Sequence, residues 1–122
     1  MFSELNIWQS ALVGFLLTLA LETPVLIAGL SPTHSLRRKL AVSLWLNAFS
    51  YPVVSLVLPI CVPQNAYIAV AEVFAPLSEC LLFAVAFGSQ TTRRDLLAIV
   101  VANLWSFLAG YALLSWVGAY GG

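Results

Sequence analysis

Three glutamates, Glu22, Glu72 and Glu79, lie within long apolar stretches of this 122-residue sequence. An ionisable side chain inside a membrane costs ~2.5–3.5 kcal/mol on insertion scales, and its default interpretation is functional. Such carboxyl groups bind a proton, a metal ion or an organic cation, or they form hydrogen bonds that join helices. The apolar stretches contain no Lys, Arg or His. A positive charge would therefore have to come from a bound cation or from a partner subunit.

Each of the four apolar stretches contributes one acidic or amide residue to a common depth: Glu22, Asn47, Glu79 and Asn103. Counted at ~1.5 Å per residue, this depth is roughly 3–5 Å to the cytoplasmic side of the bilayer centre. Glu72 lies about two turns farther out than Glu79 on the same helix face, because seven residues nearly complete two turns. We predict that this polar layer binds an ion or a substrate. Its candidate ligands are Glu22, Glu79, Asn47, Asn103, Glu72, Ser50 and Ser106.

Ligands that offer only oxygen suit hard cations, whereas transition metals prefer His and Cys. These residue types leave open whether the occupant is a proton, a metal ion or an organic cation, and no organic cofactor is expected. The sequence has no Gly-x-Ser-x-Gly elbow and no His-Glu-x-x-His motif, so we predict that the protein is not an enzyme. An intramembrane enzyme that uses Glu72 and Glu79 is the weaker alternative, because nothing near them resembles a nucleophile.

The elements that must position these residues are four apolar stretches, each long enough for the about 20 residues that a membrane-spanning helix needs. The sequence is 61% apolar and 8% charged, against about 45–50% and about 25% in soluble domains. This composition excludes a soluble domain, disorder and nucleic-acid binding. We predict an all-α membrane protein with a single domain over residues 1–122. Its four transmembrane helices are expected at about 7–30, 40–62, 66–87 and 96–117.

All five basic residues lie in the first and third predicted loops, residues 31–39 and 88–95. The positive-inside rule therefore predicts that these loops are cytoplasmic and that both termini are outside, in a multi-pass protein of a plasma (bacterial inner) membrane. Four aromatic residues at the predicted outer ends are typical of an aromatic belt. They are Trp8, Tyr67, Trp116 and Tyr120.

His34 lies in the first loop and is expected to be a solvated surface residue. Cys61 and Cys80 are expected at different depths, so a disulfide, which needs Cα atoms within about 7 Å, is not predicted. Both cysteines are interpreted as packing residues. The first apolar stretch lacks a basic n-region and is longer than a typical signal-peptide h-region, so we expect a membrane span there.

The second half of the sequence resembles the first half. An Arg pair at 37–38 precedes Asn-x-x-Ser at 47–50, and the same arrangement follows 56 positions later. Glu22 and Glu79, 57 positions apart, extend the match. Since 56 residues contain two spans, the halves, about 1–62 and 63–122, would form tandem helical hairpins related by a pseudo-two-fold axis along the membrane normal. Chance recurrence of small polar residues and Arg pairs is the alternative.

The combination of Glu-Thr-Pro at 22–24, Asn-x-x-Ser-x-Pro at 47–52, Glu72, Glu79 and Asn103-x-x-Ser covers most of the chain. It resembles a diffuse group of small, uncharacterised four-span bacterial membrane proteins, and this resemblance implies the fold but no activity. The small multidrug exporters are similar in length, in span number and in a first-helix glutamate. Their pattern does not include Glu72, Glu79 or the prolines found here.

The polar layer predicts a cation- or proton-linked transporter or a channel component. Because four helices are few for a permeation path, we expect it to act as a homo-oligomer in the lipid bilayer. The alternative is a non-catalytic structural or assembly subunit of a larger membrane protein complex, which the minimal loops and the apolar, aromatic lipid face would suit.

Overall fold

The computed structural model describes residues 7–120, and within them the side chains of residues 9, 12–113 and 115. Every regular element in this range is a helix. Four helical segments are long and apolar enough to cross a membrane. The predicted all-α, four-span fold is therefore confirmed for the described part of the chain.

The four spans follow one another through short connections. In chain order the elements are α1 (Ile7–Gly29), α2 (Leu36–Pro52), the π-helical turn η2 (Val53–Val57), α3 (Leu58–Cys61), α4 (Gln64–Phe87), the 3-10 turn η3 (Gly88–Gln90) and α5 (Arg93–Tyr120). The second span consists of α2, η2 and α3 in continuous succession. Helices α2 and α5 begin earlier than predicted, so all five basic residues lie in first helical turns and not in loops.

Two polar caps explain these early helix starts. At α2, the backbone N–H of Arg38 donates to the Ser35 Oγ at 3.1 Å. At α5, the Asp95 N–H donates to the Thr92 Oγ1 at 3.2 Å, and the Thr92 N–H donates to the Asp95 Oδ2 at 3.0 Å. Caps of this kind satisfy backbone N–H groups that the first turn of a helix leaves without partners.

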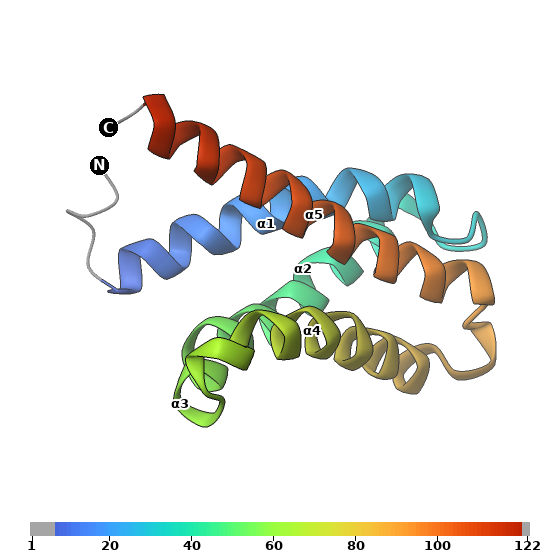
Figure 1. Ribbon diagram of the computed structural model, residues 1–122. Coiled ribbons are helices and arrows are strands. Elements are labelled where there is room, and N and C mark those ends of the chain that lie inside the picture. The colour runs from blue at the N-terminus through green and yellow to red at the C-terminus, as the bar shows by residue number, and fades with distance from the viewer. Residues whose placement is uncertain (1–6, 121–122) are drawn as a thin grey trace.

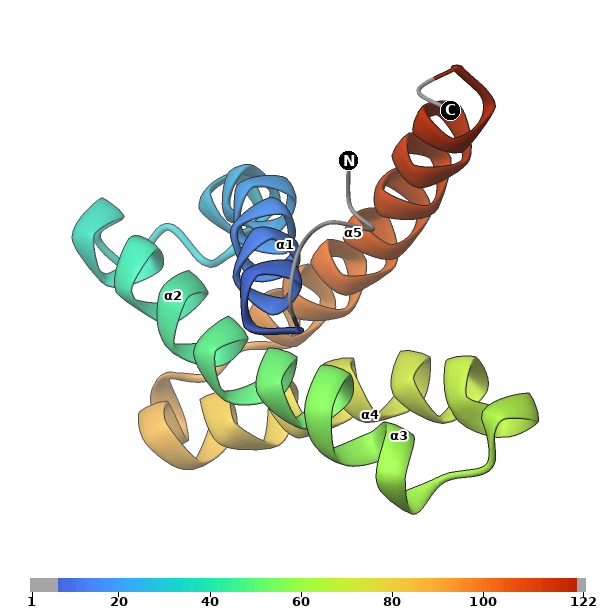
Figure 2. The same cartoon turned by 90° about the vertical axis from the view of Figure 1, so that its left-hand side faces the viewer.

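Helix α1 packs against α2 and α5, and α4 packs against the same two helices. The N-terminal end of α1, the α3–α4 turn and the C-terminal end of α5 lie at one end of the bundle, here called the terminal end (Figure 1). The α1–α2 and α4–α5 connections lie at the opposite end, called the loop end. Figure 2, a view onto the terminal end, shows α5 diverging there from α3 and the start of α4.

The buried apolar core lies toward the loop end, where the helices converge. Its members are Leu26, Leu30, Val42, Leu46, Phe83, Ala98, Ile99 and Ala102. Gly29 permits close approach of α1 and α5, since a Cβ built there would lie 2.9 Å from the Ala98 Cβ. Toward the terminal end, large apolar side chains such as Leu16 and Ile68 are exposed, as expected of surfaces that face lipid.

The proline in α2 coincides with a change of helix type. Regular α-helix ends at Pro52 and a π-helical turn follows, because proline has no N–H to donate to the preceding turn. The Ser55 hydroxyl donates to the Tyr51 carbonyl at 2.7 Å, and the Tyr67 hydroxyl donates to the Val54 carbonyl at 2.6 Å. Two carbonyls at this irregular turn are thus bonded within the protein.

Cys61 and Cys80 are free, as expected. Cys80 packs against the core, whereas Cys61 is exposed, so the packing interpretation holds only for Cys80. Of the predicted aromatic belt, Tyr67 is half-buried near the start of α4. The other three side chains lie outside the described residues: Trp8, Trp116 and Tyr120.

Candidate functional site

Glu79, on α4, joins three helices through its carboxyl group. Its side chain is fully buried. The Oε2 atom accepts a hydrogen bond from the Ser50 hydroxyl of α2 at 2.7 Å, and the Oε1 atom accepts one from the Asn103 amide of α5 at 3.2 Å. The Asn103 amide also donates to the Ile99 carbonyl at 2.9 Å. Three predicted layer residues therefore meet, and Ser50 and Asn103 fix the orientation of the Glu79 carboxyl.

Glu22, on α1, is as deeply buried as Glu79, with 1% of its surface exposed. Its Oε1 atom has no hydrogen-bond partner in the described part of the chain. Its sequence neighbour Thr23 bonds instead to the Leu19 carbonyl at 2.6 Å and to the Ser43 hydroxyl at 2.7 Å. The two glutamates at repeat-related positions thus differ, since one carboxyl group has two donors and the other has an unpartnered oxygen.

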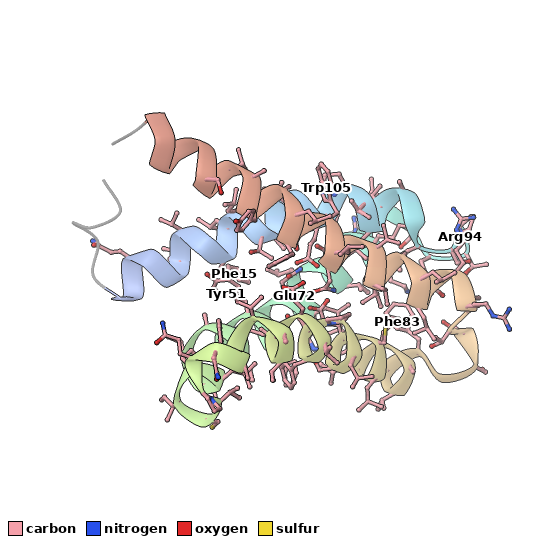
Figure 3. The ribbon with its side chains drawn as sticks, in the orientation of Figure 1. Phe15, Tyr51, Glu72, Phe83, Arg94 and Trp105 are labelled. Atoms are coloured by element: carbon pink, nitrogen blue, oxygen red, sulfur yellow. The ribbon has the colours of Figure 1, made fainter. Side chains whose placement is uncertain are left out.

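A partly open cavity of about 180 Å³ lies among the four spans. Glu22, Asn47, Ser50, Asn103, Ser106 and Glu72 all line it, so six of the seven predicted site residues gather around one space. Glu79 is the exception. It lies behind Ser50 and Asn103, which both donate hydrogen bonds to its carboxyl group. Figure 3 shows Glu72 in the middle of the bundle, between α4 and the helices opposite.

The two remaining predicted ligands are fixed by bonds within their own helices. The Asn47 amide donates to the Ser43 carbonyl at 2.8 Å, and the Ser106 hydroxyl donates to the Asn103 carbonyl at 3.0 Å. Hydrogen bonds of this local kind hold the side chains against the backbone while the residues still line the cavity.

Two aromatic side chains complete the cavity wall toward the terminal end, Tyr51 and Phe107. Tyr51 packs edge-to-face against Phe15 of α1, with ring centroids 6.0 Å apart, and Figure 3 shows these two side chains close together. The Tyr51 hydroxyl lies against Gly14, where any Cβ would collide with it. Neither wall residue was predicted from the sequence, although each directly follows a predicted serine ligand, Ser50 or Ser106.

The described residues hold no group of three or more His, Cys, Asp or Glu side chains that could bind a metal ion. No Lys, Arg or His is among the residues that line the cavity. The unpartnered carboxyl oxygen, together with amide and hydroxyl oxygens, suits a proton or a singly charged cation better than a multidentate metal centre.

A third buried carboxyl group, that of Asp95, lies at the loop end, and both of its oxygens accept hydrogen bonds. Its Oδ1 accepts from the Ser31 N–H at 2.8 Å. Its Oδ2 accepts from the Thr92 N–H and hydroxyl, both at 3.0 Å, and is paired with the His34 Nε2 at 3.2 Å. These bonds tie the α1–α2 connection to the first turn of α5.

The expectation that His34 is a solvated surface residue is wrong. Its side chain is buried, lying against Phe83 and Phe87 with centroid distances of 5.7 and 5.5 Å. The reason is the donor requirement of Asp95, which a histidine in the neighbouring connection can meet. The Thr-x-x-Asp capping pattern at 92–95 was the sequence signal that Asp95 is a structural residue.

The basic side chains act at the loop end and not in the cavity. Arg94 donates to the Gly29 and Ala28 carbonyls at 2.9 and 3.3 Å, and Lys39 donates to the Ile27 carbonyl at 3.0 Å. Cations near the carbonyls that end a helix are favourable, because the last turn leaves those carbonyls without partners.

No family model, curated protein or solved structure matches this chain. The resemblance to small four-span bacterial membrane proteins therefore stays a prediction, and the function must be inferred from the chemistry of the cavity itself.

Proposed function

We propose that this chain is a component of a cation- or proton-linked membrane transporter and that Glu22 is the group that binds the cation. One observation carries the proposal: Glu22 lines the cavity, and its buried Oε1 has no hydrogen-bond partner among the described residues. A buried carboxylate without a donor is strongly unfavourable. Glu22 is therefore stabilised by taking up a proton or by binding a cation.

The other predicted ligands support Glu22 in different ways. Glu79 is close enough to Glu22 to interact with it electrostatically, so Glu79 in its ionised form favours a cation in the cavity. Ser50 and Asn103 hold Glu79 in place. Glu72 lies on α4 about two turns nearer the terminal end, where it extends the acidic lining toward the splayed part of the bundle.

We place the chain in a plasma (bacterial inner) membrane with its loop end in the cytoplasm. The support is the positive-inside rule, because all five basic residues lie in the first turns of α2 and α5 at that end. In this orientation both termini are outside, and α5 diverges from α3 and the start of α4 on the outer side of the membrane.

Four helices are few for a permeation path, so we propose a homo-oligomer as the transporting unit. A subunit of a larger membrane complex is the second candidate. It is favoured by an apolar groove of about 600 Å³ between α1 and α5, bordered by Ala20, Pro24 and Trp105. Trp105 points away from the bundle (Figure 3). Purification in a mild detergent separates the two, since a stoichiometric partner favours the complex and a lone oligomer favours the transporter.

Proton movement in reconstituted vesicles tests the proposed function. The purified chain is placed in phospholipid vesicles loaded with a pH-sensitive dye. Internal pH is followed under an imposed membrane potential, and then after addition of sodium, potassium or benzylammonium chloride, with protein-free vesicles as the blank. We expect a protein-dependent pH change that Glu22→Gln and Glu79→Gln abolish.

Ser78→Ala is the matched control, because Ser78 precedes Glu79 on α4, does not line the cavity and donates only to the Ala75 carbonyl of its own helix. This variant should behave as the unaltered chain does. No protein-dependent pH change under any of the four conditions, or equal rates in the unaltered chain and both Gln variants, would overturn the proposal.

A further inference from the structure

The cavity has two chemically different ends. Helix direction places Glu22 and Asn47 toward the loop end, and Tyr51, Val54 and Phe107 toward the terminal end. Asn47 and Val54 are seven residues apart, which is about 10 Å along a helix axis. The space of about 180 Å³ also far exceeds the ~10–15 Å³ that one water needs. The cavity is thus long enough for a molecule and not only for a single ion.

The polar end of the cavity has few free donors. The Ser50 hydroxyl and the Asn103 amide donate to Glu79, the Asn47 amide donates to a carbonyl of its own helix, and so does the Ser106 hydroxyl. These bonds engage all four groups, the Thr18 hydroxyl one turn from Glu22 also lines the cavity, and the Glu22 Oε1 is an acceptor without a donor among the described residues. A ligand that fits this end has to bring hydrogen-bond donors and positive charge.

A primary ammonium group meets this requirement. It carries three N–H donors, one positive charge and no acceptor, so it complements a carboxyl group with an unpartnered oxygen. A quaternary ammonium has the charge but no N–H donor. A multidentate metal centre has no counterpart here, because the described residues hold no group of three or more His, Cys, Asp or Glu side chains.

The opposite end of the cavity is mainly apolar and aromatic, although the Glu72 carboxyl group also lines it. Val54, Pro76 and the aromatic rings of Tyr51 and Phe107 line it, and Phe15 supports Tyr51 from behind by its edge-to-face contact. Apolar walls favour burial of an apolar substituent. Aromatic faces add attraction for a nearby cation.

We propose that the cavity binds a protonated primary amine that carries an apolar, ring-sized substituent. The ammonium group lies at Glu22 and the substituent lies between Tyr51 and Phe107. This inference rests on the proposed function, since it takes Glu22 to be the cation-binding group. It adds the chemical class of the ligand and two residues, Tyr51 and Phe107, that determine specificity.

Calorimetric titration of the full chain in lipid nanodiscs, corrected for empty nanodiscs, tests this inference. The probes are benzylammonium, methylammonium, benzyltrimethylammonium and benzyl alcohol. They differ in the apolar ring, in the N–H donors and in the charge. We expect benzylammonium to bind at least about tenfold more tightly than each of the other three, as one charged hydrogen bond or one buried ring justifies.

Variants locate the two parts of the ligand. Glu22→Gln, which keeps the size of the side chain, should weaken benzylammonium binding by about tenfold or more. Tyr51→Leu should weaken benzylammonium by about threefold or more while leaving methylammonium binding unchanged. Ser78→Ala should bind all four probes as the unaltered chain does. Each variant is first shown to elute at the same oligomeric size and to have the same helical content.

Three results would overturn the inference. The first is equal affinity for methylammonium and benzylammonium, the second is undiminished benzylammonium binding by Glu22→Gln, and the third is no benzylammonium binding at all. Proton movement in vesicles that persists alongside any of them would leave the cation-linked function standing and remove only the ligand class. Loss of that proton movement as well would remove both.

Discussion

Asp95 at the loop end and Glu22 in the middle of the bundle are both buried carboxyl groups, with 0% and 1% of their surfaces exposed. Asp95 is surrounded by donors from Ser31, Thr92 and His34. The Glu22 Oε1 has no donor in the described part of the chain. Burial alone therefore does not distinguish a structural acid from a functional one.

The difference lies in whether the protein itself completes the hydrogen bonding. A carboxyl group that serves the fold is saturated, because an unmet acceptor in a low-dielectric interior destabilises the folded state. Glu79 is intermediate, with two side-chain donors. Substitutions at these positions should rank in stability by the number of donors that each carboxyl group receives.

The largest loss is expected for Asp95→Ala. The change leaves the Ser31 N–H, the Thr92 N–H and His34 without their shared acceptor, so the free energy of unfolding should fall by about 3–5 kcal/mol. Unfolding in mixed detergent micelles measures this. A loss below about 1 kcal/mol would contradict the structural role of Asp95.

His34→Ala should have the next largest effect, with a loss of about 1.5–3 kcal/mol of unfolding free energy. It removes the hydrogen bond to the charged Asp95 and the ring that packs against Phe83 and Phe87. The same unfolding measurement applies, with exposed Ser89→Ala as a matched loop-end control that should change stability by less than about 0.5 kcal/mol. Equal effects of the two substitutions would restore the surface interpretation of His34.

Glu79→Gln should have a smaller effect. The amide keeps one carbonyl acceptor for Ser50 or Asn103 and gives up the other bond, so about 0.5–1.5 kcal/mol of unfolding free energy should be lost. A double-mutant cycle with Ser50→Ala measures the coupling directly. Strict additivity of the two changes would mean that the 2.7 Å contact contributes nothing.

The smallest effect is expected for Glu22→Met. This substitution replaces an unpartnered polar side chain by an apolar one of similar length, so the unfolding free energy should stay unchanged or rise. A loss of more than about 2 kcal/mol would show that Glu22 has structural partners and would remove its contrast with Asp95.

Much of the fold could be predicted because its causes are local. The length and hydropathy of each apolar stretch fix the spans, and the rise per residue fixes the depths of Glu22, Asn47 and Asn103. The rotation of each helix about its axis is set by packing against its neighbours. The depth of a residue in the membrane does not predict this rotation. Hence six of the seven predicted residues line one cavity, while Glu79 lies behind the cavity wall and the Asn47 amide donates to a carbonyl of its own helix.

The remaining features depended on contacts between distant segments. The pairing of His34 with Asp95 joins residues 61 positions apart, and no hydropathy pattern reports such a contact. The predicted pseudo-two-fold repeat stays a prediction. At the level of side chains, the related pair Glu22 and Glu79 have different partners, so any symmetry of the backbone does not extend to the chemistry of the site.

An infrared difference spectrum, recorded on the full chain in nanodiscs before and after addition of benzylammonium, tests most directly that Glu22 is the open cation-binding group. A change in the carboxyl bands that is lost in Glu22→Gln and retained in Ser78→Ala is the predicted result. A carboxyl change that is identical in Glu22→Gln and the unaltered chain would contradict it.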